Sequence, residues 1–293
     1  AFMHMLMKEE NEKYHQLIKN TLEFNPEILK RYVNFMSNPD EQTAIAQFGK
    51  DDKYFGVALM MVTLPGLPMF GHAQIEGFTE KYGMEYKRAY YDELPDEQLI
   101  RRHEHEIFPI MKRRHLFSDV TNFELYDFHD SHGHTNHNVF AYSNMAGGER
   151  ALIFYHNKYQ ECKGWIRWSA QKSRSVEGGG RRNTTRTLGA ALGINPAEKY
   201  FYVFKDYKTN LEFIRSGREL HERGMYAELR AFEYHIFLDF REVYDTTGEY
   251  DHIARQLRGQ GVSSIQHAFL EIKQAPIHEA AKALFSPSNV AAL

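Results

Sequence analysis

One stretch of the chain, residues 32–77, constrains the fold more than any other. It alternates short apolar runs with polar segments, in the order strand, loop, helix, strand and loop: Tyr32–Met36, Ser37–Glu41, Phe55–Leu64, Leu67–Phe70 and Gly71–Gly77. Asp51 and Asp52 offer N-cap oxygens to the helix, and Pro65 with Gly66 ends it. The stretch therefore predicts one α/β unit, with polar residues gathered where each strand ends.

Polar side chains follow both predicted strands. In parallel sheets and barrels, the loops after the strands build the active site. We therefore expect Asp40 and the pair Gln74 and Glu76 to lie at one edge of neighbouring strands. A second interpretation remains open, because Asn38-Pro39-Asp40 is also a common turn sequence, in which Asp40 would only cap the turn.

Two segments in this stretch, Phe35–Asp40 and Leu64–Gly77, resemble the seventh and eighth strands of the alpha-amylase family of glycoside hydrolases. The family pattern is an apolar run ending in Asn-His-Asp, then Pro-Gly-x-Pro, further apolar residues and a loop similar to Gly-Asp/Gln-Glu-x-Gly. This chain departs from the pattern at Pro39, where the family usually has a sugar-binding His, at Ala73, where a Gly is typical, and in the order around Glu76.

The resemblance implies a role in sugar chemistry for residues at both strand ends. Asp40 would bind sugar hydroxyls and help to stabilise an oxocarbenium-like transition state, while Asn38 and Gln74 would bind substrate. The implied substrate is an α-glucan or maltooligosaccharide, and neither a cofactor nor a metal is implied. A retaining glycosidase also needs a nucleophile and a general acid/base about 5–5.5 Å apart. In the family these come from the fourth and fifth strands, so we expect the C-terminal portion of a glycosidase, inactive without the missing N-terminal part of its barrel.

The hydrophobic period changes near residue 117, which predicts three parts. We expect an α/β part over residues 1–116, the C-terminal part of a (β/α)8 barrel by resemblance, with helices over residues 1–31 and 97–115. An antiparallel β domain follows over residues 117–248, a β-sandwich in the family, and a helical tail with a loose end over residues 249–293. Strand-like runs in the β domain are 123–128, 139–144, 151–157, 164–169, 200–206, 209–214 and 232–240.

Composition excludes several classes of protein. The chain has 293 residues and a net charge of −3 with both signs mixed, so it lacks the basic surface typical of a nucleic-acid-binding protein. A single cysteine, Cys162, excludes an internal disulfide framework and is typical of a reducing, cytoplasmic compartment. The longest apolar run, Phe55–Leu64, is too short to span a bilayer, so no membrane segment is expected.

Three other segments carry residues with possible chemistry. His129–His137 could bind Zn, Ni or Cu through its imidazoles, but it lies between predicted strands and is also typical of a polar hairpin loop. Gln171–Arg186 combines Gly178–Gly180 with basic residues, which would suit a phosphate. Because no Gly-Lys-Ser/Thr ending follows the glycines, we interpret the segment as a mobile basic surface loop. Cys162 has no base beside it in the sequence, which argues against a nucleophile.

Aromatic side chains leave a second class of function open. In residues 78–93, tyrosines such as Tyr86 and several basic residues could stack against a sugar, or simply pack the loop. In the β domain, Trp165 and Trp168 could bind carbohydrate. The alternative function is therefore a non-catalytic carbohydrate-binding or scaffolding module in which the β domain does the binding.

Overall fold

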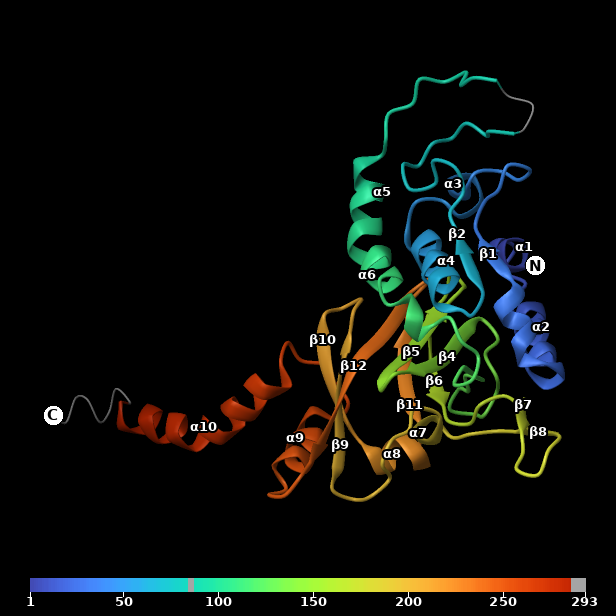
Figure 1. The fold of residues 1–293 in the computed structure, drawn as a ribbon. Helices are drawn as coiled ribbons and strands as arrows, with labels where there is room; N and C mark the ends of the chain where they lie inside the picture. Colours follow the sequence, from blue (N-terminus) through green and yellow to red (C-terminus); the bar gives the residue numbers. More distant parts are fainter. Residues whose placement is uncertain (84–86, 286–293) are drawn as a thin grey trace.

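A six-stranded antiparallel sheet lies at the centre of the fold, with strand order β10-β9-β12-β5-β4-β3 (Figure 1). The computed structural model describes residues 1–83 and 87–285. The strands of this sheet are β3 (Glu124–Tyr126), β4 (Val139–Ala146), β5 (Glu149–His156), β9 (Tyr200–Asp206), β10 (Leu211–Ser216) and β12 (Tyr234–Tyr244). The other strands form two-stranded pairs: β1 (Val33–Phe35) with β2 (Leu67–Met69), β6 (Cys162–Ile166) with β11 (Met225–Leu229), and β7 (Lys172–Ser175) with β8 (Arg181–Thr184).

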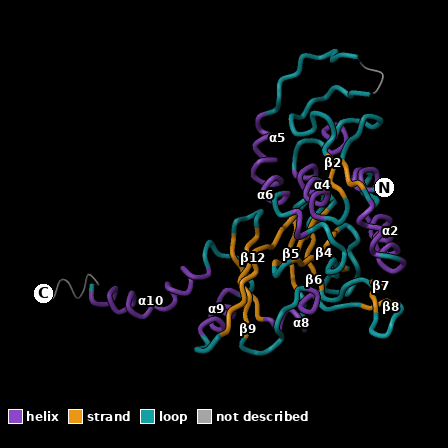
Figure 2. Tube along the Cα trace, viewed as in Figure 1, coloured by secondary structure: helices purple, strands orange, loops and turns teal. Residues whose placement is uncertain are grey.

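Helices lie before, between and after the strands (Figure 2). Those of the first part are α1 (Phe2–Met7), α2 (Asn11–Phe24), the 3-10 turn η1 (Pro26–Arg31), α3 (Ala44–Phe48), α4 (Asp52–Thr63), α5 (Glu97–Arg102), the π-helical turn η2 (His103–Ile107), α6 (Phe108–Met111) and the 3-10 turn η3 (Arg114–Leu116). Those of the later part are α7 (Leu188–Ala191), α8 (Gly217–Glu222), α9 (Glu249–Leu257) and α10 (Ile265–Leu284). None of the helices in the described residues has the length and apolar character needed to cross a bilayer.

The predicted α/β unit forms in the expected order. β1, α4 and β2 follow one another, and β1 pairs with β2 in parallel. Among the described residues these are the only two strands that pair in parallel, and they do not close into a barrel. Asp51 precedes α4 as predicted, but its side chain accepts no capping hydrogen bond.

The helix predicted over residues 97–115 is wrong as one continuous element. Its start is confirmed, because Asp96 accepts hydrogen bonds from the backbone N–H groups of Gln98 and Leu99. Beyond α5 the chain changes to a π-helical turn before α6. Pro109 explains the change, since it has no N–H to donate and its ring interferes with an α-helical turn.

The predicted loop Gln171–Arg186 is also wrong, because it contains the antiparallel hairpin of β7 and β8. Gly178–Gly180 turn the hairpin, and all three have positive φ angles that favour glycine. Lys172 anchors its base by donating hydrogen bonds to three backbone carbonyls between Val120 and Phe123. The strands carry polar side chains on both faces, which leaves no hydrophobic alternation in the sequence to reveal them.

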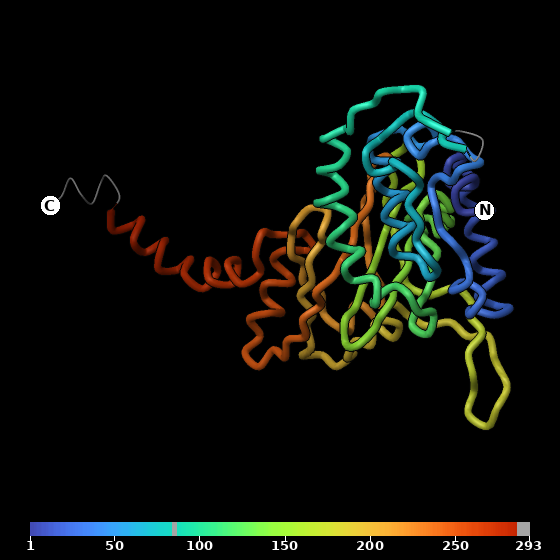
Figure 3. The backbone as a smooth tube through the Cα atoms, turned by 45° about the horizontal axis from the view of Figure 1, so that its top comes forward, coloured from blue at the N-terminus to red at the C-terminus, as the bar shows by residue number. Residues whose placement is uncertain are grey.

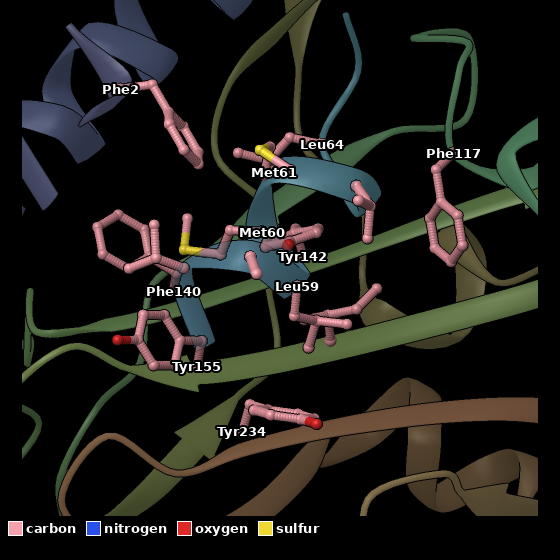
Figure 4. Packing of buried hydrophobic residues seen from close by; sticks show 14 of the residues in the cluster. Phe2, Leu59, Met60, Met61, Leu64, Phe117, Phe140, Tyr142, Tyr155 and Tyr234 are labelled. Carbon is pink, nitrogen blue, oxygen red and sulfur yellow. The ribbon is translucent and has the colours of Figure 1, made fainter. Parts of the chain in front are cut away.

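The largest core lies between α4 and one face of the central sheet. Leu59 and Met60 of α4 pack against Tyr142 and Tyr155 of the sheet (Figure 4). The helix approaches the sheet closely at Gly56, where an added Cβ would lie 2.0 Å from the ring of Tyr155. This core contains residues from both sides of position 117. The shared core does not by itself separate two domains there, and the domain boundaries stay a prediction.

A second core covers the opposite face of the sheet. Successive residues of β5 alternate between the two cores, with Ile153 in the first and Leu152 and Phe154 in the second. Helices α7 and α8 and the pair β6 and β11 close the second core from outside. The face that carries α4 and the face that carries β6 and β11 are therefore opposite sides of one sheet.

The C-terminal helices lie at the β10 edge of the sheet. Ile253 of α9 and Ile265 of α10 pack against Phe201 of β9 in a third apolar cluster. The remainder of α10 extends away from the sheet (Figure 3). The tail predicted to be loose, residues 286–293, and Tyr86 of the aromatic segment lie outside the described residues.

Candidate functional site

The candidate site begins with the register of β1 and β2. The strands pair in parallel, with Val33 opposite Leu67 and Phe35 opposite Met69. Buried Asn34 in β1 reinforces the pair, because its Nδ2 donates to the carbonyl of Pro65 at 3.1 Å. The loops after both strands therefore leave the same edge, as the sequence predicts.

The two loops touch at Gly71. An added Cβ there would lie 2.1 Å from the Oγ of Ser37, so the loops can approach this closely only with glycine at that position. Gln74 is buried, and its Oε1 accepts a hydrogen bond from the Gly71 N–H at 2.9 Å. The same oxygen lies 3.5 Å from Ser37 Oγ, and Gln74 Nε2 faces the sulfur of Met36 at 3.6 Å. The side chain of Gln74 thus joins the two loops.

Asn38 shapes the turn that carries Asp40. Its Oδ1 accepts hydrogen bonds from the backbone N–H groups of Asp40 at 3.0 Å and of Glu41 at 2.9 Å. This is the side-chain turn typical of an Asn-Pro-Asp sequence. The Asp40 side chain is exposed, and its carboxylate makes no hydrogen bond or ion pair with any residue that the structure describes. The turn is therefore made by Asn38, and the carboxylate of Asp40 is left free.

The chain that follows the Gly71–Gly77 loop, beginning at Phe78, forms a covering segment that folds back over the strand ends. Lys81 Nζ donates to the backbone carbonyl of Asp40 at 2.7 Å, and the ring of Tyr82 lies edge-on to His72 with 4.7 Å between centroids. Side chains of this segment, of the loops after β1 and β2 and of the start of α3 surround a cavity of about 40 Å³, which Asn38 lines and Asp40 does not. Such a cavity has room for about one water molecule. The strand ends are therefore covered on this side, and Asp40 faces outward.

Two carboxylates hold the covering segment in place. Glu80 accepts hydrogen bonds from the backbone N–H groups of Tyr90 and Tyr91. Glu93 accepts from the N–H of Thr79 at 2.8 Å and from its hydroxyl at 2.5 Å. Burial acts to raise the pKa of Glu93, but the hydrogen bonds from Thr79 and from the Glu80 N–H outweigh it and lower that pKa.

A buried tyrosine and histidine lie behind the site. Tyr54 of α4 has its hydroxyl 2.9 Å from Nε2 of His103 in the π-helical turn. His103 Nδ1 lies 2.8 Å from the carbonyl of Leu99, and because a carbonyl only accepts, Nδ1 carries the proton and Nε2 accepts from Tyr54. Burial lowers the pKa of His103. No sequence pattern indicates this pair, because the two side chains meet only through the packing of α4 on the π-helical turn.

The remaining candidates from the sequence are the histidine segment His129–His137 and the thiol of Cys162. The described residues contain no group of three or more His, Cys, Asp or Glu side chains able to hold a metal ion. Within His129–His137, Asp130 Oδ1 accepts from the backbone N–H groups of His132 and His134, which is the geometry of a polar loop. Burial raises the pKa of Cys162 to about 11, which disfavours the thiolate that a nucleophile needs.

Comparisons with known proteins give similarity at the level of structure. No protein-family model matches the sequence, and no curated protein matches it. An alpha-amylase from Anoxybacillus aligns with 84% of this chain and 46% of its own, at 12% identity and a TM-score of 0.48. A maltogenic alpha-amylase from Thermotoga neapolitana aligns with 80% of this chain and 47% of its own, at 10% identity and a TM-score of 0.47.

An alpha-amylase from Geobacillus thermoleovorans, solved in complex with acarbose, aligns with 72% of this chain and 39% of its own, at 12% identity and a TM-score of 0.44. The chain thus spans less than half the length of each of these three structures. Likeness at this level assigns no residue roles to this chain.

Proposed function

We propose that this chain is the C-terminal portion of an alpha-amylase-like glycoside hydrolase acting on α-glucans. The observation that carries the proposal is the parallel, in-register pairing of β1 with β2, which brings the loops of Ser37–Glu41 and Gly71–Gly77 to one edge. If β1 and β2 lay far apart or ran in opposite directions, the resemblance to the seventh and eighth strands of the alpha-amylase barrel would have no structural basis.

In this proposal Asp40 stabilises the transition state. Its carboxylate is free, exposed and fixed at a strand end by the Asn38 turn. An ionised carboxylate there accepts hydrogen bonds from sugar hydroxyls and stabilises the positive charge that develops on the ring as the glycosidic bond breaks. The sugar approaches from the exposed side of Asp40, because the segment with Lys81 covers the other side.

Asn38 and Gln74 contribute to the same site in different ways. The Asn38 oxygen is occupied by the turn, which leaves its Nδ2 as the group that donates to a sugar hydroxyl. Gln74 is buried and joins the two loops, so it acts on substrate by fixing the position of the Gly71 loop.

Complementation tests this proposal. The nucleophile and the general acid/base belong to other strands of the barrel in this mechanism. Mixing this chain with a separately expressed polypeptide that supplies those strands should restore hydrolysis of maltoheptaose, whereas each polypeptide alone should be inactive. Activity of this chain alone, or none in a mixture that forms a stable complex, contradicts the proposal.

A second candidate function is carbohydrate binding without catalysis. It is favoured by the indole rings of Trp165 and Trp168 in the β domain, which are 40% and 52% exposed although large aromatic side chains are usually buried. Affinity electrophoresis in glycogen or starch separates the two candidates. Retardation that is lost in Trp165→Ala or Trp168→Ala but kept in Asp40→Asn favours the binding module.

A further inference from the structure

A cleft of about 900 Å³ lies on the face of the central sheet that carries β6 and β11. Its floor includes His235 and Phe237 of β12. The alternate residues Tyr234 and Ile236 point the other way, into the core beneath α4. The cleft is therefore on the opposite side of the sheet from α4, and its size is within the range of ligand-binding sites.

One wall of the cleft is an exposed aromatic pair. Trp165 of β6 and Tyr226 of β11 lie directly opposite each other in the antiparallel register. Their ring centroids are 4.7 Å apart and their planes are tilted by 54°. Such a pair stabilises a two-stranded sheet, but these rings also remain 40% and 38% exposed. They offer an apolar surface of the kind on which sugar rings stack.

The lining of the cleft also includes a buried guanidinium. Arg215 is only 9% exposed, and it donates to the carbonyls of Ile214 at 2.9 Å and Gly259 at 3.1 Å. No carboxylate among the described residues lies within ion-pair distance of it. Burial lowers the pKa of Arg215, and the more distant charge of Glu219 offsets this only in part. A buried positive charge usually has a negative partner, because desolvation of an unpaired charge is costly.

Two more arginines at the cleft also lack an ion pair. Arg223 and Arg258 are exposed and follow the ends of α8 and α9, and neither forms an ion pair with any described residue. By contrast, Arg218 pairs with Glu222 on its own helix at 3.0 Å. Arg258 has a φ of +49°, a left-handed conformation in which glycine is favoured. A long cationic side chain is thus present where the backbone favours glycine.

We infer that this cleft binds an anionic saccharide. Its sugar ring stacks on Trp165 and Tyr226, and its phosphate or carboxylate group is bound by the guanidinium groups of Arg215, Arg223 and Arg258. The carboxylate of Glu228, which also lines the cleft, accepts a hydrogen bond from the Tyr226 hydroxyl at 2.6 Å and orients that ring. This site is independent of the proposed role of Asp40, because it lies across the sheet.

Isothermal titration calorimetry on this chain tests the inference and needs no hydrolytic activity. The probes are glucose 6-phosphate, glucuronic acid, glucose and inorganic phosphate. We expect at least one of the two anionic sugars to bind about tenfold or more tightly than both glucose and inorganic phosphate. Glucose 6-phosphate as the tighter ligand identifies a phosphorylated saccharide, and glucuronic acid a carboxylated one.

Variants assign the binding to the cleft. Arg258→Gly, which the left-handed backbone accommodates, and Trp165→Ala should each weaken binding of the anionic sugar about tenfold. Arg182→Ala and Tyr159→Ala change an exposed arginine and an exposed tyrosine outside the cleft and should leave binding unchanged. Equal affinity for glucose, inorganic phosphate binding as tightly as the sugars, no binding of either anionic sugar, or equal losses in the outside variants would each overturn the inference.

Discussion

Ser37 Oγ and Gln74 Oε1 lie 3.5 Å apart, although 37 residues separate them in the sequence. Each follows one of the two parallel strands, so their contact measures how closely the strand ends approach. Gly71 lies between them and leaves no space for a side chain. The proposed function depends on this convergence, and the convergence can be tested by mutation.

Gly71→Ala should destabilise the protein. The added methyl group would lie 2.1 Å from Ser37 Oγ, so the loops must separate or distort. Overpacking of this kind costs about 1–3 kcal/mol of the free energy of unfolding. Urea denaturation should show the loss as a lower midpoint.

A double-mutant cycle assigns that loss to Ser37. Ser37→Ala removes the hydroxyl and leaves a Cβ 3.2 Å from the added methyl group. The variant with both changes should therefore be more stable than the sum of the single changes predicts, by about 1 kcal/mol. Strict additivity would show that the two loops do not meet as described.

Gly56→Ala should also destabilise the protein, against the trend of helix propensity. Alanine stabilises a helix interior by about 1 kcal/mol relative to glycine, so propensity alone predicts a gain. Packing predicts a loss of about 1–3 kcal/mol, because the new Cβ would lie 2.0 Å from the ring of Tyr155. The sign of the change in thermal denaturation midpoint decides, and a gain would contradict the packing of α4 on β5.

Stability should fall as the pH decreases from about 6.5 towards 4 because of His15. Burial lowers the pKa of His15 to about 4, although its hydrogen bond to the Val139 carbonyl and the charge of Asp127 oppose the shift. In the unfolded chain the pKa is about 6.5, so between these values the unfolded state binds the proton more strongly. The stabilisation is complete above the unfolded pKa and is lost as the pH falls to the folded pKa.

The expected loss from His15 is roughly 3 kcal/mol. His15 stacks on Phe140 with 4.4 Å between centroids, and His137 and Lys19 are the nearby groups that disfavour its charge. Urea midpoints at several pH values should fall more steeply for the wild type than for His15→Leu. Parallel curves would show that His15 does not titrate in this range.

Glu93→Ala should loosen the segment that covers the strand ends. The change removes the hydrogen bonds from the N–H and hydroxyl of Thr79. Loss of about 1–2 kcal/mol of local stability should raise the rate of limited trypsin cleavage near Lys81 about tenfold. Glu97→Ala, an exposed glutamate in α5, should leave that rate unchanged. Equal rates in both variants would mean that Glu93 does not hold the segment.

The sequence predicted the elements whose hydrophobic period is clear. β1, α4 and β2 each carry an apolar run, and Pro65 with Gly66 separates α4 from β2. Their order and the meeting of the loops after the two strands could therefore be predicted. The hairpin of β7 and β8 could not, because its alternating side chains are polar on both faces. The break before α6 had a visible cause in Pro109, which a periodic apolar pattern concealed.

The candidate site was predictable in part. The turn sequence around Asn38 indicated the loop that carries Asp40, and the structure forms that turn. The buried position of Gln74 and the close contact at Gly71 depend on how two distant loops pack, which no local pattern encodes. The cleft with Arg215 likewise combines residues from separate strands, from α8 and from α9 with the loop after it.

The central claim is that Asp40 takes part in the cleavage of an α-glucan, and kcat/KM for maltoheptaose tests it most directly. The measurement uses the complemented enzyme with wild-type chain, with Asp40→Asn, and with Asp51→Asn, whose exposed side chain caps no helix N–H. Loss of transition-state stabilisation predicts a fall of about 100-fold or more for Asp40→Asn and none for Asp51→Asn. Equal kcat/KM values for Asp40→Asn and the wild type would contradict the claim.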